Sequence, residues 1–362
     1  MDISILVFGF ITAFLVVLLA TPSLIKVAKL KHLVDEPSEA RKVHKKRIPT
    51  IGGIIIFSSI LFSYSLWFPD ANMDTLEFSE AIKQFKYIVA CLLILFFVGV
   101  KDDIIGTAPV KKLAAHMIVA FILVIMANIK ITNMQGLFGV TKDLPEYVSV
   151  LLSFFVYVVI VNAMNLIDGL DGLAGGVGLI CGGLFAAWFG MSGNLPLALL
   201  SATLVGALLG FLVFNFSPAK IFMGDSGSLT IGATISVLAI NAIETPSEVV
   251  ITELQNVSIP VFVMAILVYP LIDTLRVFTM RALKGRSPFS ADRNHLHHKL
   301  TDLGLNHKKT VIIIYSFNLF VVGATLLFGL FLNPTLQLIC TVALVLLLIQ
   351  IPLFMHKRKF AK

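Results

Sequence analysis

Long apolar runs alternate with short polar stretches along this chain of 362 residues. A helix that crosses a bilayer needs about 20 apolar residues, within a range of roughly 17 to 25. By this measure the chain contains eleven candidate spans, of which the third and the eighth are short. They lie near residues 3–24, 51–69, 85–100, 113–130, 147–164, 174–192, 196–214, 228–243, 258–278, 311–331 and 335–353. The pattern predicts an all-α polytopic membrane protein, formed as one integral-membrane domain over residues 1–362.

Composition supports this fold class and excludes others. Apolar residues make up 57% of the chain and charged residues 14%, against roughly 45–50% and 25% in a typical soluble domain. This excludes a soluble enzyme, a secreted disulfide scaffold and a disordered chain. The first apolar run lacks the basic leader and cleavage site of a signal peptide, so we expect it to be a retained span. The net charge of +7 is typical of membrane topology rather than of nucleic-acid binding.

The positions of Lys and Arg predict the orientation of the spans, because cytoplasmic loops carry an excess of these residues. Of the 28 Lys and Arg residues, 24 lie in alternate loops and in the C-terminal tail, all on one side if there are eleven spans. We therefore expect the N-terminus outside and the C-terminus in the cytoplasm. The predicted cytoplasmic loops, which form one candidate active-site face, are about 25–50, 101–112, 165–173, 215–227 and 279–310.

Five aspartates stand at predicted cytoplasmic ends of spans, in three loops that are distant in the sequence. They are Asp102, Asp103, Asp168, Asp171 and Asp225. A single aspartate at a helix end is most often a solvated cap. Five on one face, in loops also rich in Gly and Asn, favour a functional role, because polar groups near a bilayer cost free energy.

Two of these loops are Gly-rich. In Asn165-Leu-Ile-Asp168-Gly-Leu-Asp171, two carboxylates three residues apart share one face of a helical turn. Such a turn either links two spans flexibly or offers oxygen ligands to a hydrated Mg²⁺ or to a sugar. In the second loop, Asp225 and Ser226 lie just before a predicted helix. They could cap that helix, or Asp225 could hold a metal while backbone N–H groups bind phosphate.

The last loop carries three histidines within four positions, namely His295, His297 and His298, beside Arg293 and Lys299. A zinc site is disfavoured because no Cys lies nearby and the surroundings are cationic. Imidazole and guanidinium groups make charge-assisted hydrogen bonds to phosphate oxygens. The loop therefore favours a polyanion site.

One face thus combines carboxylates suited to Mg²⁺ with cations suited to phosphate. Phosphoryl transfer needs this combination, because in that chemistry the protein mainly positions groups and neutralises charge. The alternative from another class is a secondary transporter of an anionic solute. Against a transporter, the polar groups gather at one surface and we expect the long spans to be free of charge.

The motifs in these loops resemble those of the polyprenyl-phosphate N-acetylhexosamine-1-phosphate transferases. The resemblance extends from about Val34 to Lys309. It is carried by Val-Lys-Asp102-Asp103, Asn165-Leu-Ile-Asp168-Gly-Leu-Asp171-Gly-Leu-Ala, Phe222-Met-Gly-Asp225-Ser-Gly-Ser and His295-Leu-His297-His298, in family order. Members transfer a sugar 1-phosphate from a UDP-sugar to undecaprenyl phosphate, release UMP and require Mg²⁺, with Mn²⁺ as an alternative. The resemblance implies a multi-pass protein of the bacterial inner membrane with a cytoplasmic active site.

The resemblance also implies roles for individual residues. Asp225 falls on the Mg²⁺ ligand, and Asp168 lies near the metal and the nucleotide. The candidate catalytic acids are Asp102, Asp103, Asp168 and Asp171, with Asp102 proposed to act on the lipid phosphate. The candidate substrate-binding residues are Lys45, Thr50, Lys111, Lys112, Asn165, Asn215, Phe222, Arg293, His295, His297 and His298. The resemblance does not decide between Lys111 and Lys112.

The histidine loop favours one branch of the family. Members that use UDP-MurNAc-pentapeptide usually carry three consecutive histidines, whereas His295-Leu-His297-His298 resembles the UDP-GlcNAc branch. We therefore predict transfer of GlcNAc 1-phosphate from UDP-GlcNAc to undecaprenyl phosphate. This would be the first membrane step of a teichoic acid, O-antigen or common-antigen type of polysaccharide. A phospho-MurNAc-pentapeptide transferase is the alternative, and both GalNAc as the sugar and a homodimer are left open.

Overall fold

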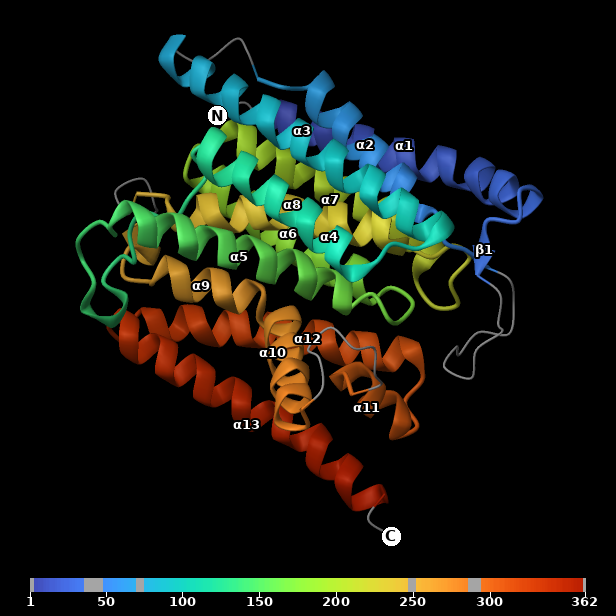
Figure 1. The fold of residues 1–362 in the computed structure, drawn as a ribbon. Coiled ribbons are helices and arrows are strands. Elements are labelled where there is room, and N and C mark those ends of the chain that lie inside the picture. Colours follow the sequence, from blue (N-terminus) through green and yellow to red (C-terminus); the bar gives the residue numbers. More distant parts are fainter. Residues whose placement is uncertain (1–2, 36–47, 70–74, 247–251, 286–293, 361–362) are drawn as a thin grey trace.

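The computed structural model describes residues 3–35, 48–69, 75–246, 252–285 and 294–360, and it is almost entirely helical (Figure 1). The α-helices are α1 (Ile3–Leu30), α2 (Gly52–Leu66), α3 (Thr75–Ile105), α4 (Pro109–Phe121), α5 (Glu146–Leu166), α6 (Leu173–Met191), α7 (Leu195–Asn215), α8 (Gly224–Ile243), α9 (Ile259–Ile266), α10 (Val268–Leu283), α11 (Leu296–Asp302), α12 (His307–Gly329) and α13 (Pro334–Phe360). Short helices of other types are η1 (Ile122–Met126), η2 (Leu137–Gly139) and η4 (Thr252–Leu254). Two-residue strands β1 (Val34–Asp35) and β2 (Ile48–Pro49) pair antiparallel.

Each predicted span coincides with a helix or with a pair of consecutive helices. Among the described residues, eight helices are long and apolar enough to cross a membrane: α1, α4 with η1, α5, α6, α7, α8, α12 and α13. The bent pair α9–α10 would be a ninth. Of the two remaining predicted spans, one corresponds to α2, with 15 residues, and the other lies within α3, with 31. The prediction of an all-α multi-span membrane protein is confirmed, whereas eleven spans and the orientation of the termini stay predictions.

Two predicted loops are shorter than expected. The loop over 101–112 is wrong at both ends, because α3 continues through Asp102 and Asp103 to Ile105 and α4 begins at Pro109. The loop over 279–310 begins inside α10, contains α11 and ends after α12 has begun. The two aspartates therefore stand on the last turn of a rigid helix rather than on a loop.

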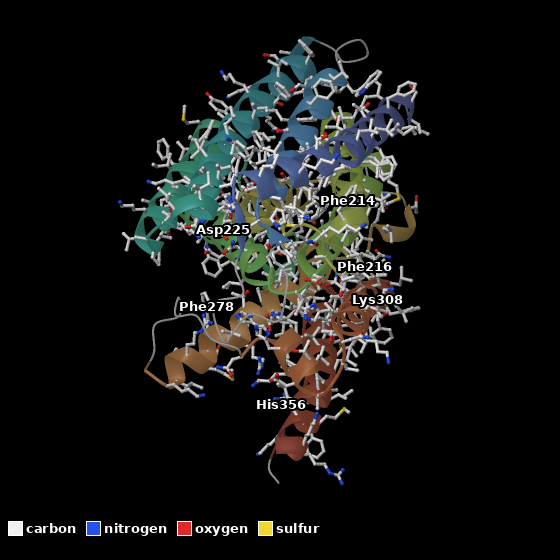
Figure 2. The ribbon with its side chains drawn as sticks, turned by 90° about the vertical axis from the view of Figure 1, so that its right-hand side faces the viewer. Phe214, Phe216, Asp225, Phe278, Lys308 and His356 are labelled. Carbon is white, nitrogen blue, oxygen red and sulfur yellow. The ribbon has the colours of Figure 1, made fainter. Side chains whose placement is uncertain are left out.

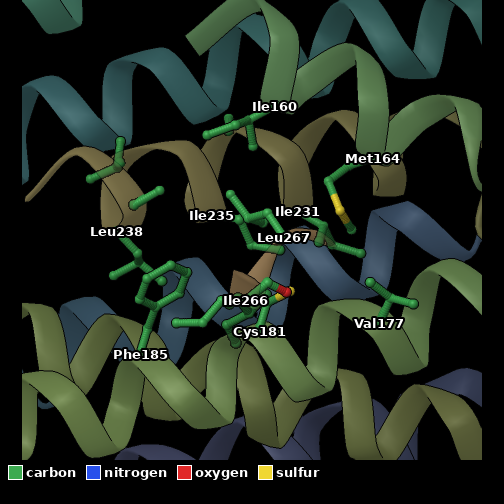
Figure 3. Close-up of a cluster of buried hydrophobic side chains, with 14 of the residues drawn as sticks. Ile160, Met164, Val177, Cys181, Phe185, Ile231, Ile235, Leu238, Ile266 and Leu267 are labelled. Carbon is green, nitrogen blue, oxygen red and sulfur yellow. The ribbon is translucent and has the colours of Figure 1, made fainter. Parts of the chain in front are cut away.

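Helix α8 forms the centre of the bundle, because nearly all of its residues are buried. It packs against α2, α3, α5 and α6. Figure 3 shows Ile231, Ile235 and Leu238 of α8 among apolar side chains of neighbouring helices. The polar residues at the start of α8 are thus carried on the most completely buried helix.

Glycines bring three helices together at the start of α8. A β-carbon on Gly53 of α2 would meet the backbone of Gly227, and one on Gly99 of α3 would meet the backbone of Ser226. Small residues allow helix backbones to approach this closely inside a membrane. The packing places the end of α3 and the start of α2 directly against the start of α8.

The chain breaks between α9 and α10, which are bent by 77° at Leu267 (Figure 1). A break frees backbone groups that must find other partners. Asn318 of α12 supplies them, because its amide donates to Ile266 O at 3.0 Å and accepts from Tyr269 N at 3.2 Å. The expectation of charge-free spans is wrong here, since α10 carries a fully buried Asp273.

Candidate active site

Asp103 joins the end of α3 to the first turn of α8. Its carboxylate accepts hydrogen bonds from Asp225 N at 2.6 Å, from Ser226 N at 3.1 Å and from Ser226 Oγ at 2.6 Å. The first N–H groups of a helix lack intrahelical partners and favour a negative charge. Asp103 therefore caps α8 from another helix, whereas Asp225 and Ser226 do not act as its cap.

Lys112 lies between two of the predicted acids. Its Nζ atom is 2.8 Å from Asp102 Oδ2 and also forms an ion pair with Asp225 Oδ2. Lys112 is half-buried, whereas Lys111, the residue before it in α4, is exposed. The structure thus brings Lys112, and not Lys111, into the acidic cluster.

Asp168 lies in the turn between α5 and α6 and is part of the same cluster. Burial raises the pKa of Asp168 to about 7, and the negative charges of Asp225, Asp103 and Asp171 add to this rise. Asp168 therefore feels the charge of the acids around the start of α8. Asn165, one turn earlier, donates to Ser228 Oγ at 2.8 Å and so holds this turn against α8.

The segment before α2 runs along the segment before α8. Phe222 N donates to Pro49 O at 2.7 Å, and Gly52 N donates to Phe222 O at 3.0 Å. Gly53 N donates to Met223 O at 2.8 Å. Thr50 and Phe222 therefore lie beside the cluster through backbone pairing, as neighbours of Asp225.

Asp171 anchors its loop through partners that do not belong to the acidic cluster. Its Oδ2 atom accepts from Ala219 N at 3.2 Å and lies 3.5 Å from His307 Nδ1. Burial acts to raise the pKa of Asp171, but the hydrogen bonds from His307 and Ala219 outweigh it and lower the pKa. These bonds connect the α5–α6 turn to the α7–α8 loop and to α12.

Asn215 has a similar connecting place. It is buried, accepts from Gly172 N at 3.0 Å and donates to Ile221 O at 2.9 Å. On the same turn, Tyr315 of α12 donates to Gly172 O at 2.5 Å. Lys308 also reaches this region, with its Nζ atom 5.8 Å from the ring centroid of Phe216 (Figure 2). The oxygen and the NH2 group of the Asn215 side chain therefore both have hydrogen-bond partners within the protein.

The three histidines form a cluster that touches the Asp168 turn. The ring of His297 lies 5.3 Å from that of His295 and 4.3 Å from that of His298, measured between centroids. A β-carbon on Gly169 would come within 2.8 Å of His297 Nε2. Burial lowers the pKa of His297 to about 3, although Asp273 acts in the opposite direction. His297 is therefore neutral at pH 7.

Several residues around the site were missed from the sequence, namely Tyr269, Asp273, Arg276, His307 and Tyr315. Asp273 accepts from His295 Nδ1 and from Leu296 N, both at 2.7 Å. The available signal was a carboxylate inside an apolar run, which is functional in most cases. His307 lies just after the last predicted loop motif and carried no comparable signal.

The predicted site residues thus separate into three groups. The first group gathers at the start of α8. Asp102 and Asp225 pair with Lys112, Asp103 and Asn165 bond to the first turns of α8, Asp168 lies near their charges, Thr50 and Phe222 lie beside them, and the histidines are in contact through Gly169. Asp171 and Asn215 join loops at the edge of this group. The third group is not part of the described site: Lys111 is exposed, and Lys45 and Arg293 lie outside the described residues.

Carboxylates, one ammonium group and the imidazoles of the histidine cluster, of which that of His297 is neutral, therefore meet at one end of the bundle. This set can hold a divalent cation, because hard cations prefer oxygen ligands, and it can donate hydrogen bonds to phosphate oxygens. Its chemical capacity is that of a phosphoryl-transfer site.

Comparisons with known proteins agree with this chemistry. The model of glycosyl transferase family 4 matches residues 85–243. The "Probable undecaprenyl-phosphate N-acetylglucosaminyl 1-phosphate transferase" of Bacillus subtilis is 32% identical over 86% of this chain and 81% of its own length. The decaprenyl-phosphate N-acetylglucosaminephosphotransferase of Mycobacterium tuberculosis is 34% identical, over 84% of this chain and 78% of its own.

A relative from Escherichia coli K12 is more distant. This undecaprenyl-phosphate alpha-N-acetylglucosaminyl 1-phosphate transferase is 28% identical, over 80% of this chain and 74% of its own length. The matches cover most of each protein, so they concern the whole bundle and not one motif. The chain belongs to glycosyl transferase family 4, in the branch of the polyprenyl-phosphate N-acetylglucosamine-1-phosphate transferases.

Proposed function

We propose that this protein transfers GlcNAc 1-phosphate from UDP-GlcNAc to undecaprenyl phosphate. An oxygen of the lipid phosphate attacks the β-phosphorus of UDP-GlcNAc and forms a new P–O bond. The bond between the β-phosphorus and the bridging oxygen breaks, and UMP leaves with that oxygen. The products are UMP and undecaprenyl-diphosphate-GlcNAc.

The observation that carries this proposal is the meeting of α3, α4 and the α5–α6 turn at the start of α8. The Lys112 ammonium group pairs with both Asp102 and Asp225, and Asp103 holds the first turn of α8. These residues come from parts of the chain that are distant in sequence. A transporter would need its polar groups along a path through the bundle, and the described cluster instead lies at one end of α8.

Mg²⁺ fits the donor set, with Mn²⁺ as an alternative. Asp168 and Asp225 would hold the ion. Burial raises the pKa of Asp168, the neighbouring carboxylates add to the rise, and a bound cation would favour its charged form. Bound there, the ion would neutralise charge on the diphosphate. Asn165, held by Ser228, keeps the Asp168 turn in place.

The remaining residues position groups and donate hydrogen bonds. Lys112 offers a positive charge for the phosphoryl oxygens, and His297 offers a neutral ring nitrogen beside Gly169. A phosphate monoester has a second pKa of about 6, so the acceptor is mostly dianionic at pH 7. The acceptor therefore needs no strong base, and we assign Asp102 to holding Lys112 rather than to proton removal.

We place this site on the cytoplasmic side of a bacterial inner membrane. The support is the distribution of Lys and Arg, which lie mainly on one side of the membrane if the chain has eleven spans and its N-terminus outside. A homodimer stays a prediction. Cysteine labelling of loop positions in intact cells and in inverted vesicles tests the orientation, and opposite faces for residues 106 and 220 would contradict it.

The activity test uses the purified full-length protein with UDP-GlcNAc, undecaprenyl phosphate and Mg²⁺. We expect UMP release together with label from the sugar in the lipid extract. UDP-MurNAc-pentapeptide in the same assay tests the alternative donor. Turnover of that donor alone would overturn the proposed substrate, and uptake into sealed vesicles without a lipid product would overturn the reaction.

A further inference from the structure

One face of α10 holds the whole segment that carries the histidines. Tyr269, Asp273 and Arg276 are spaced i, i+4 and i+7, so they line one side of the helix. Arg276 Nη1 donates to Asn294 O at 2.6 Å. We call these three residues the α10 face.

The contacts of the α10 face run in order along the segment. Asp273 accepts from His295 Nδ1 through Oδ2 and from Leu296 N through Oδ1, both at 2.7 Å. Tyr269 Oη lies 3.0 Å from His297 Nδ1. The chain from 294 to 297 therefore lies antiparallel to α10, with each step fixed by one of the three residues.

Asp273 is fully buried, and a buried carboxylate is tolerated only when it is paired and hydrogen-bonded. Both of its oxygens are engaged with the histidine segment. A carboxylate that accepts from one ring nitrogen fixes the orientation of that ring and leaves the other nitrogen to act elsewhere. In His295 the nitrogen left available is Nε2.

The hydroxyl of Tyr269 determines what His297 presents to the Asp168 turn. If Tyr269 donates to Nδ1, the neutral ring carries its proton on Nε2, which faces Gly169 beside Asp168. The opposite arrangement would turn a lone pair toward carboxylates and toward an anionic substrate, which is electrostatically unfavourable. Tyr269 as the donor is therefore the favoured arrangement.

Asp273, His295 and His297 are also close enough together to be considered as metal ligands. However, both oxygens of Asp273 and the Nδ1 atoms of both histidines already have hydrogen-bond partners. The set is thus complete as a hydrogen-bonded network, and zinc becomes one outcome of the test below.

We infer that the α10 face is a positioning element for the UDP-sugar diphosphate: Tyr269 holds His297 with a proton on Nε2, and Asp273 orients His295. The inference rests on the proposed function and names residues for that site which the histidine motif does not contain. It assigns these residues a role through the histidines, with no direct contact to the reacting atoms.

The test is a double-mutant cycle on the purified full-length protein, with kcat and KM measured for UDP-GlcNAc. Tyr269→Phe should raise KM roughly 3- to 10-fold, the effect of one hydrogen bond, with a smaller change in kcat. In His297→Gln the side-chain amide always carries N–H donors, so its ability to donate does not depend on a ring tautomer set by Tyr269. Adding Tyr269→Phe to His297→Gln should therefore change KM by less than about 2-fold.

Tyr157→Phe is the matched control, since it removes a buried hydroxyl that has no hydrogen-bond partner in the described part of the chain. Its KM should equal that of the wild type. Asp273→Asn and His295→Gln form a second cycle. The KM of the double variant for UDP-GlcNAc should equal that of the single variant with the higher KM. This second cycle keeps the test decisive if either Tyr269 variant fails to fold.

Three results would overturn the inference. One is equal effects of Tyr269→Phe in the wild-type and His297→Gln backgrounds, and another is an unchanged KM in the folded single variants. The third is one zinc atom per wild-type chain that is lost in Asp273→Asn. A wild-type protein that releases no UMP would instead overturn the proposed function itself, so the two failures are distinguishable.

Discussion

Gly169 and His297 lie in direct contact, because a β-carbon at Gly169 would come within 2.8 Å of His297 Nε2. The contact joins the Asp168 turn to the histidine cluster, which belongs to a segment more than a hundred residues away. The Asp168 side of the contact carries candidate ligands for a cation. The histidine side carries candidate hydrogen-bond donors to phosphate oxygens.

Gly169→Ala should therefore displace the His297 ring and lower transferase activity about 10-fold or more, in line with small misplacements of catalytic groups. Gly183→Ala is the matched control, since a β-carbon at Gly183 meets no atom within 4 Å. The control should keep full activity. Equal activities of the two variants in UMP release would contradict the role of this contact.

Lys112→Met should lower activity by roughly 100-fold, the usual cost of removing one charge-stabilising donor from an active site. Lys111→Met tests the other lysine of the predicted pair and should stay within about 2-fold of the wild type, as surface substitutions do. The measurement is kcat/KM for UDP-GlcNAc with both proteins at equal thermal stability. The reverse order of the two effects would exclude Lys112 from the site.

Asp225→Asn should lose about 100-fold or more of the activity, because it removes a proposed cation ligand. Adding Mg²⁺ to chelator-treated wild type should restore activity and raise its apparent Tm, and neither effect should occur in the variant. Asp143→Asn, which changes an acid outside the site, serves as the control. A variant that Mg²⁺ still stabilises like the wild type would remove Asp225 from the ligand set.

Asp171→Asn should affect stability more than chemistry, because Asp171 binds His307 and Ala219 at the edge of the site. The folded pKa of Asp171 is lowered, so its contribution to the free energy of unfolding is present above about pH 4. That contribution is lost as the pH falls through the folded pKa. We expect an apparent Tm about 2 to 5 °C below wild type at pH 7.

The difference in apparent Tm should close as the pH falls through the lowered folded pKa of Asp171, because the wild-type carboxyl then also becomes neutral. Turnover at pH 7 should stay within about 10-fold of the wild type. A loss of activity as large as that of Asp225→Asn, with unchanged stability, would return Asp171 to the catalytic acids.

The fold was predictable as far as it depends on the length of apolar runs. A run of about 20 apolar residues forms a helix in a bilayer because its backbone groups must be satisfied internally. The break at Leu267 was not predictable in this way, since the run over 258–278, although it contains Asp273 and Arg276, has the length and apolar content of one span. Its stability depends on Asn318, a residue of another helix.

The candidate site was predictable as a set of loops on one side, because the alternation of spans determines which loops share a face. The pairing inside the set depends on tertiary packing. Helix phase separates Lys112 from Lys111, and close glycine contacts bring Asp103 to the first turn of α8. Asp273 was overlooked because it is a single acid within an apolar segment.

The ammonium group of Lys112 lies between Asp102 and Asp225 and would influence how a divalent cation binds in this cluster. A divalent cation that bound to Asp225 would compete with the ammonium group of Lys112, so its binding would exchange one positive charge for another. Such an ion would gain less binding free energy than the number of aspartates suggests, because it would displace a positive charge already present. In the absence of a metal, the ammonium group of Lys112 neutralises part of the negative charge of these aspartates.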